Sequence, residues 1–148
     1  MNYRKFLIAA LLVMSFAVQA KDITVTRLTC EMRDGRVTTS DTPRLGWQMS
    51  SPENGTRQTA YEIEIRDVWA GKVVWNSGKV KSAQSQLVSC ADAALEKDRH
   101  YTWRVRVWDE ADTPSAWSAP SDFSSLTSEA AFAGSEWIGA ITLSLIHI

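Results

Sequence analysis

Residues 95–118, with the sequence LEKDRHYTWRVRVWDEADTPSAWS, constrain the fold more than any other part of the chain. Successive side chains of a β-strand point to opposite sides of a sheet, so a half-buried strand alternates between two sets of residues. Here the two sets are Tyr101, Trp103, Val105 and Val107 on one face, and Thr102, Arg104, Arg106 and Trp108 on the other. Leu95 precedes Tyr101 by six positions, a spacing typical of the tyrosine corner of β-sandwich domains. The segment therefore predicts a sandwich.

Other short segments have strand-like composition and end at turn residues. They are residues 23–31, 44–49, 60–68, 72–75, 86–90 and 117–126, the last of which is interrupted by Pro120. The first changes its apolar face between Val25 and Leu28, as a bulged edge strand does. Together with residues 100–108 they give seven short strands, which predict an all-β sandwich. No segment has a sustained helical period, although residues 128–134 could form a turn or two of helix.

Period-two alternation also predicts which side chains of two other strands fill the core. The expected inward residues are Leu45, Trp47 and Met49 from residues 44–49, and Tyr61, Ile63 and Ile65 from residues 60–68. If residues 60–68 lie antiparallel to residues 100–108, the outward Glu62 and Glu64 face the arginines of that strand. Those opposite charges would form cross-strand pairs on the outer face of the sheet.

The same pairing would place Arg106 between Trp108 and Trp117, in cation–π contact with both rings; the alternative is a solvated surface. These three residues are our candidates for glycan stacking or for contact with a neighbouring domain. Among the chain's seven tryptophans, Trp47, Trp75 and Trp103 alternate with core neighbours and are expected to be buried. For Trp69, Trp108, Trp117 and Trp137 we favour packing against a neighbouring module or strand over stacking on a sugar.

The first 20 residues have the pattern of a signal peptide. Arg4 and Lys5 give a basic start, residues 6–18 are an apolar run, and residues 18–20 form a small-x-small cleavage site. The run is too short to span a membrane, and nothing later in the mature chain resembles a span. We therefore expect a periplasmic or extracellular protein whose domain covers residues 21–127.

The mature charge limits the partners of the domain. The chain has 16 Lys and Arg against 17 Asp and Glu, and removal of Arg4 and Lys5 leaves 14 basic residues and a net charge near −3. This balance argues against nucleic acid and anionic membranes as partners.

Two cysteines, Cys30 and Cys90, could form a disulfide in an exported protein or remain free and buried. If they lie on strands separated by a third, two inter-strand steps of about 4.8 Å exceed the roughly 7 Å between Cα atoms that a disulfide tolerates. We therefore favour free thiols. The histidines are His100 and His147, and neither has neighbours at metal-ligand spacing, so we expect no metal site and no cofactor.

The sequence offers no catalytic residue. A glycosidase needs two carboxyl groups across a sugar pocket, whereas Asp34, Asp41, Asp92 and Asp109 lie in turns where acids are usually solvated. No G-x-S-x-G elbow or glycine-rich phosphate loop is present. His100 begins a strand and is expected at the surface rather than acting as a base. We predict no catalytic, cofactor-binding or metal-binding residues.

Five motifs in order resemble the N-terminal module of the bacterial α-L-rhamnosidase family of glycoside hydrolases. They are SDTPRLGWQM (40–49), RQTAYEIEI (57–65), VVWNSGKVKS (73–82), HYTWRVRVWD (100–109) and SAWS (115–118). The resemblance implies a fibronectin type III-like or immunoglobulin-like sandwich, followed in the family by further β-sandwich modules, an (α/α)6 barrel and a C-terminal β-domain. Residues 128–139 would be a linker and the first strand of the next module, since residues 136–139 resemble the start of that strand.

The family hydrolyses terminal α-L-rhamnosyl residues with inversion, using carboxyl groups of the barrel to which no position here corresponds. The resemblance therefore implies a non-catalytic structural module that packs against the remaining modules of a secreted parent enzyme. Alternatives are a module that binds a plant or bacterial rhamnose-containing glycan, and an adhesion-type sandwich of an unrelated surface protein. Residues 143–148 match no part of the family, so we expect residues 140–148 to be a truncated or aberrant tail.

Overall fold

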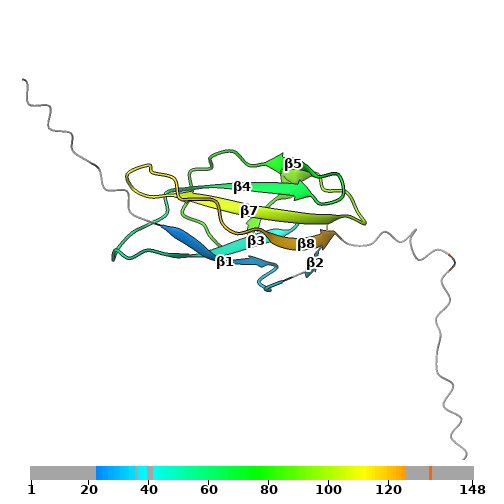
Figure 1. Cartoon of the computed structure of the whole chain (residues 1–148), viewed down its shortest axis with the longest axis horizontal. Helices are drawn as coiled ribbons and strands as arrows, with labels where there is room; N and C mark the ends of the chain where they lie inside the picture. The colour runs from blue at the N-terminus through cyan, green and yellow to red at the C-terminus, as the bar shows by residue number, and fades with distance from the viewer. Residues whose placement is uncertain (1–22, 36, 40–41, 126–133, 135–148) are drawn as a thin grey trace, which may run out of the picture.

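The computed structural model describes residues 23–35, 37–39, 42–125 and 134 as a sandwich of two β-sheets (Figure 1). The smaller sheet has the order β1–β3–β6, formed by Thr24–Cys30, Arg44–Ser50 and Val88–Ser89. The larger has the order β2–β8–β7–β4–β5, formed by Val37–Thr39, Ser121–Ser125, His100–Trp108, Ala60–Asp67 and Lys72–Asn76. The predicted all-β sandwich is confirmed.

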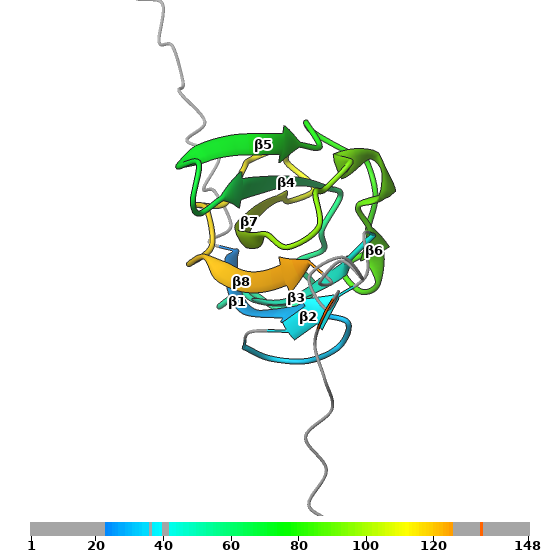
Figure 2. The ribbon, with the colours of Figure 1, turned by 90° about the vertical axis from the view of Figure 1, so that its right-hand side faces the viewer.

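Figure 2 looks onto the end of the sandwich at which β8 finishes, with the larger sheet curving over the smaller one. The core lies between the sheets and is filled by the residues that the alternation predicts to face inward. Its fully buried members include Leu45, Ile63, Ile65, Trp103, Val105, Val107 and Phe123. One prediction was wrong. Met49 is 37% exposed, because it lies near the end of β3 at the rim of the sheet rather than over the core.

The predicted strands match the structure in position, with three differences. β2 was missed because its three residues are too few to show an alternating pattern, and it pairs in parallel with β8. The strand expected over 117–126 is interrupted at Pro120 as predicted, because proline has no N–H for a ladder, but only the part after it, from Ser121, is a regular strand. The segment expected over 86–90 is reduced to Val88–Ser89, followed by the short 3-10 helix η1, Ala91–Ala93. The register of β1 shifts between Val25 and Arg27, which confirms the bulge.

Several expectations fall on residues outside the described part. These are the signal peptide, the linker and tail over 128–139 and 140–148, and the individual residues Asp41, Trp137 and His147. Within the described ranges, no helix is long and apolar enough to cross a membrane.

The tyrosine corner predicted for Tyr101 is present. Its hydroxyl accepts a hydrogen bond from the backbone N of Glu96 at 3.0 Å and donates one to the backbone O of Glu96 at 3.2 Å. Leu95 packs against the core beside it. Burial raises the pKa of the Tyr101 hydroxyl, so it stays protonated and able to donate at neutral pH. The corner therefore ties the η1–β7 connection to the start of β7.

Both cysteines are free and buried in the structure. Cys30 pairs with Leu45 of β3, and Leu45 pairs on its other side with Val88 of β6, two residues before Cys90. β3 therefore lies between the two cysteine-bearing segments, the arrangement on which the expectation of free thiols was based. Burial raises the pKa of each thiol to about 12.

We predict that Tyr101→Phe lowers the free energy of unfolding by about 1–3 kcal/mol, because it leaves the N–H and C=O of Glu96 without their partner. Urea denaturation followed by tryptophan fluorescence measures the change. Tyr61→Phe is the matched control, since Tyr61 is another buried tyrosine of the larger sheet and lies outside the corner. Equal losses for the two variants would contradict a role for the corner hydrogen bonds.

We further predict that the stability of the domain falls as the pH rises from about 9 towards about 12. An unfolded thiol ionises near pH 8.5, whereas the native Cys30 and Cys90 hold their protons to about 12, so over this range the unfolded state binds fewer protons than the native state. Urea midpoints at several alkaline pH values measure the slope, and a Cys30→Ala/Cys90→Ala variant should show a shallower one. Rapid alkylation of the native thiols near pH 8 would refute this prediction.

Candidate functional site

The outer face of the larger sheet holds the charged residues that the pairing of β4 with β7 brings together. Glu62 lies opposite Arg106 and Glu64 opposite Arg104. The Arg106 Nε donates to Glu62 Oε2 at 2.8 Å, and the Arg104 Nε donates to Glu64 Oε1 at 2.9 Å. In each pair the arginine Nη2 reaches the same carboxylate oxygen. The predicted cross-strand ion pairs are therefore confirmed.

Two tryptophans lie among these arginines. The Arg106 guanidinium is 5.1 Å from the ring centroid of Trp108 and 4.8 Å from that of Trp117, as expected. Arg104 lies 4.5 Å from the Trp117 centroid, and the Lys79 ammonium lies 4.8 Å from that of Trp108. We call these five residues (Lys79, Trp108, Arg106, Trp117 and Arg104) the cation–π row. Each indole in the row contacts two cations of its own domain.

The SAWS motif holds Trp117 in the row. The Ser115 hydroxyl accepts from the backbone N of Val107 at 3.1 Å, and the Ser118 hydroxyl accepts from the backbone N of Val105 at 3.1 Å. In return the backbone N groups of Ser115 and Ser118 donate to the carbonyls of Val107 and Val105. The pairing of β7 with β8 reaches only as far as Trp103. Beyond that residue the two serines supply hydrogen-bond partners for the backbone N–H and C=O groups of β7. This explains why residues 115–118 bond to β7 without forming a regular strand.

The environments of the other tryptophans differ from one another. Trp47 and Trp103 are buried as predicted, whereas Trp75 is only half-buried. Trp108 lies on the outer face but is only 7% exposed, because the row covers its ring, and this leaves little surface on which a sugar could stack. Trp117 is half-buried, and Trp69 is 67% exposed.

One expectation about a polar residue was wrong. Asp109 was expected in water but is 1% exposed, because its Oδ1 accepts the backbone N of Thr113 and so holds the turn after β7. The second oxygen of this carboxylate, Asp109 Oδ2, is buried without a hydrogen-bond partner among the described residues, and a strand pattern does not reveal such burial. His100 begins β7 and is partly exposed, with its Nδ1 3.3 Å from Ser124 Oγ.

The remaining acids that sequence analysis considered are exposed. Asp34 and Asp92 lie in solvent, and the hydrogen bond from Arg27 lowers the pKa of the Asp34 carboxyl. Across the described ranges, no three His, Cys, Asp or Glu side chains gather closely enough to hold a metal ion.

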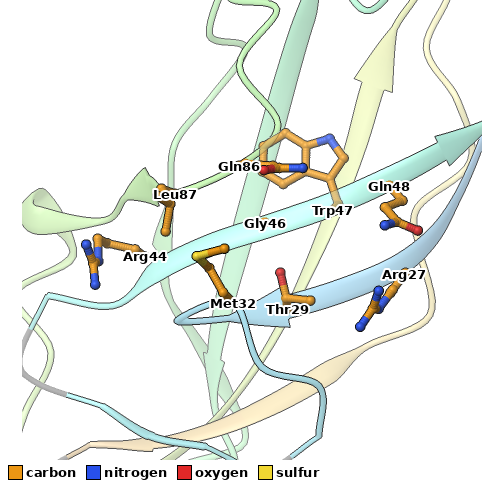
Figure 3. Close-up of a pocket in the computed structure, with 9 residues that line it drawn as sticks. All are labelled: Arg27, Thr29, Met32, Arg44, Gly46, Trp47, Gln48, Gln86 and Leu87. Carbon is orange, nitrogen blue, oxygen red and sulfur yellow. The ribbon is translucent and has the colours of Figure 1, made fainter.

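A shallow hollow on the outer face of the smaller sheet was missed by sequence analysis (Figure 3). Its floor is Gly46, where an added Cβ would lie 2.8 Å from Thr29 Oγ1. Met32, which is 70% exposed, and Leu87 flank it, both with positive φ. A left-handed backbone is unusual at residues other than glycine, and nothing in the amino-acid sequence around Met32 and Leu87 predicts it. Polar side chains also line the hollow, namely those of Arg27, Thr29, Arg44, Gln48 and Gln86. The two arginines are already ion-paired, Arg27 with Asp34 and Arg44 with Glu31.

Comparisons with known proteins identify relatives of the described domain. The family model described as "Rha78A-like, N-terminal immunoglobulin domain" matches residues 25–125. An alpha-L-rhamnosidase of Streptomyces avermitilis is 42% identical over 101 residues, which are 66% of this chain and 10% of that protein. One from Formosa agariphila is 32% identical over 107 residues, which are 67% of this chain and 11% of that protein. The chain therefore spans about a tenth of the length of these curated relatives.

Solved structures give the same result. The crystal structure of Streptomyces avermitilis alpha-L-rhamnosidase complexed with L-rhamnose matches with a TM-score of 0.64 and 38% identity, covering 70% of this chain and 10% of that one. The structure of alpha-L-rhamnosidase from Dictyoglumus thermophilum matches with a TM-score of 0.67 and 27% identity, covering 78% and 14% respectively.

We predict that Trp117→Ala lowers the free energy of unfolding by about 1–3 kcal/mol, because it removes two cation–π contacts of about 0.5–1 kcal/mol each and a half-buried ring. Trp69→Ala is the matched control and should change the free energy by less than about 0.5 kcal/mol, since that ring is exposed. Urea denaturation compares the two. The row would have no stabilising role if both variants unfolded at the wild-type midpoint.

Proposed function

Because the chain belongs to the family of Rha78A-like N-terminal immunoglobulin domains, we propose that it serves as a non-catalytic structural module of an exported α-L-rhamnosidase. In this role the domain packs against the remaining modules of the same polypeptide. The first 20 residues, with their signal-peptide pattern, support export to the periplasm or the extracellular space.

The observation that carries this proposal is that four carboxylates of the larger sheet and its turns already bind groups of the domain itself. Glu62 and Glu64 are bound by the guanidinium groups of β7, and Asp109 holds a turn. Asp67 is also buried, and its Oδ1 accepts the backbone N of Ala70. A glycosidase needs one carboxylic acid and one carboxylate facing a sugar-sized site. Carboxylates that anchor strands and turns are suited to stability instead.

We propose that the chemistry belongs to the longer polypeptide of which such domains form about a tenth. That polypeptide would hydrolyse terminal α-L-rhamnosyl residues with inversion, using carboxyl groups outside this domain. A rhamnose-containing glycan is then the substrate of the parent enzyme rather than a ligand of the cation–π row. The burial of Trp108 and the cations against both indoles of the row support this assignment.

We predict that the purified chain releases no rhamnose from an aryl α-L-rhamnoside above the rate of the buffer. A colorimetric assay with the full-length Streptomyces avermitilis enzyme as positive control makes the measurement. A Glu62→Gln/Glu64→Gln variant separates true turnover from contamination, because activity that persists in it does not come from these two carboxylates. Turnover by the pure chain that this variant abolishes would refute the non-catalytic role.

A further inference from the structure

Trp69 is the most exposed aromatic side chain among the described residues, with 67% of its surface accessible. It lies in the turn between β4 and β5, next to Val68, which is also exposed. In the cation–π row, by contrast, each indole has two cations within about 5 Å. Trp69 has a single described cation nearby, the Arg99 guanidinium at 5.8 Å from its ring centroid. An exposed indole of this kind is typical of the centre of a protein interface.

The turn that carries Trp69 is held in place by hydrogen bonds. The carboxylate and the carbonyl of Asp67 accept the backbone N groups of Ala70 and Gly71 at 2.8 and 3.0 Å. The backbone N of Val68 donates to the carbonyl of His100 on β7 at 3.0 Å. Gly71 adopts a φ of +64°, which a glycine permits without strain. The indole is therefore presented by a fixed turn, so little conformational entropy is lost when a partner covers it.

The end of β8 lies beside this turn. Arg99, whose guanidinium is near Trp69, donates its backbone N to Ser125 Oγ at 2.9 Å, and the backbone N of Ser125 donates to the Arg99 carbonyl at 3.0 Å. Figures 1 and 2 show the β4–β5 turn and the end of β8 on the same end of the sandwich. One hollow there is lined by Trp69, Asp98, Arg99, His100, Ser124 and Ser125. Its lining combines one aromatic ring with polar and charged groups, a combination that occurs in protein interfaces.

We propose that this end of the sandwich, with Trp69 as its apolar anchor, is the docking surface for the module that follows β8 on the parent polypeptide. The inference rests on the proposed function, because it names the surface through which the structural module acts. The occupant is a folded protein surface that places an apolar side chain against the indole and polar groups against Arg99 and His100.

The position of Ser125 favours this occupant over others. The curated relatives are about ten times longer than the matched domain, and Ser125, the last residue of β8, itself lines the hollow. A module joined there has a high effective concentration at the surface, which a separate molecule lacks. A second copy of the chain would have to approach at the point where each copy's own polypeptide leaves the sheet. A sugar would compete with Arg99 for the indole ring.

The test compares the accessibility of Trp69 in two proteins by hydroxyl-radical footprinting and mass spectrometry. One is the full chain, and the other is a fusion in which residues 1–125 replace the matched domain of the Streptomyces avermitilis enzyme. Hydrolysis of an aryl rhamnoside by the fusion reports that it is folded. We expect oxidation of Trp69 to fall by about tenfold in the fusion, as for a residue buried at an interface centre. Met32, equally exposed on the other sheet, is the internal control and should be oxidised at the same rate in both proteins.

A second measurement uses the variant Trp69→Ser in the fusion, with Met32→Ser as the matched control. We expect Trp69→Ser to speed proteolytic cleavage after residue 125 by about tenfold, and Met32→Ser to leave it unchanged. Equal oxidation of Trp69 in the full chain and in an active fusion would overturn the docking surface. The proposal would also be overturned if Trp69 of the full chain, without the fusion, became protected from oxidation when the protein concentration was raised or a rhamnose oligosaccharide was added. None of these results alters the activity assay of the full chain, so the two proposals fail separately.

Discussion

Eight residues of β4 pair with eight residues of β7, from Ala60 opposite Trp108 to Asp67 opposite Tyr101. This register determines both faces of the larger sheet, because a shift by one residue would exchange them. On the inner face it stacks Ile63 and Ile65 with the aliphatic and aromatic side chains of β7. On the outer face it sets each glutamate opposite an arginine. The core and the charged face therefore follow from one pairing.

The cation–π row extends that pairing beyond the two strands. Arg106 is fixed on one side by Glu62 and contacts two indoles, so its position depends on both an ion pair and the SAWS segment. Trp117 in turn depends on the hydroxyls of Ser115 and Ser118, which replace a strand partner along β7. Loss of one member should therefore loosen its neighbours, and the contributions are not expected to add independently.

Most of this architecture can be predicted from the sequence, because the alternation of inward and outward residues along a strand and the fixed spacing between two residues are both visible in it. Tyr101 is found through its spacing from Leu95, and the position of Arg106 between two indoles follows from the strand pairing. β2 is too short to have a pattern, and its parallel partner is far away in sequence. The burial of Asp109 depends on one backbone N–H in a turn, and that of Trp108 on cations from other segments. Such contacts are tertiary, so a local pattern cannot contain them.

Some surface side chains are matched by partners within the domain and others are left exposed, and this difference indicates where another module would bind. Along the outer face of the larger sheet, charges and rings are already matched within the domain, so a ligand there would have to break contacts before it made new ones. The end that carries Trp69 has the opposite character: its turn is rigid, but its indole is open and lies next to the last strand. In such a sandwich the outer face of the larger sheet contributes stability, and the end that carries Trp69 is left exposed for association with another module. That division suits a module whose task is to hold its neighbours in position.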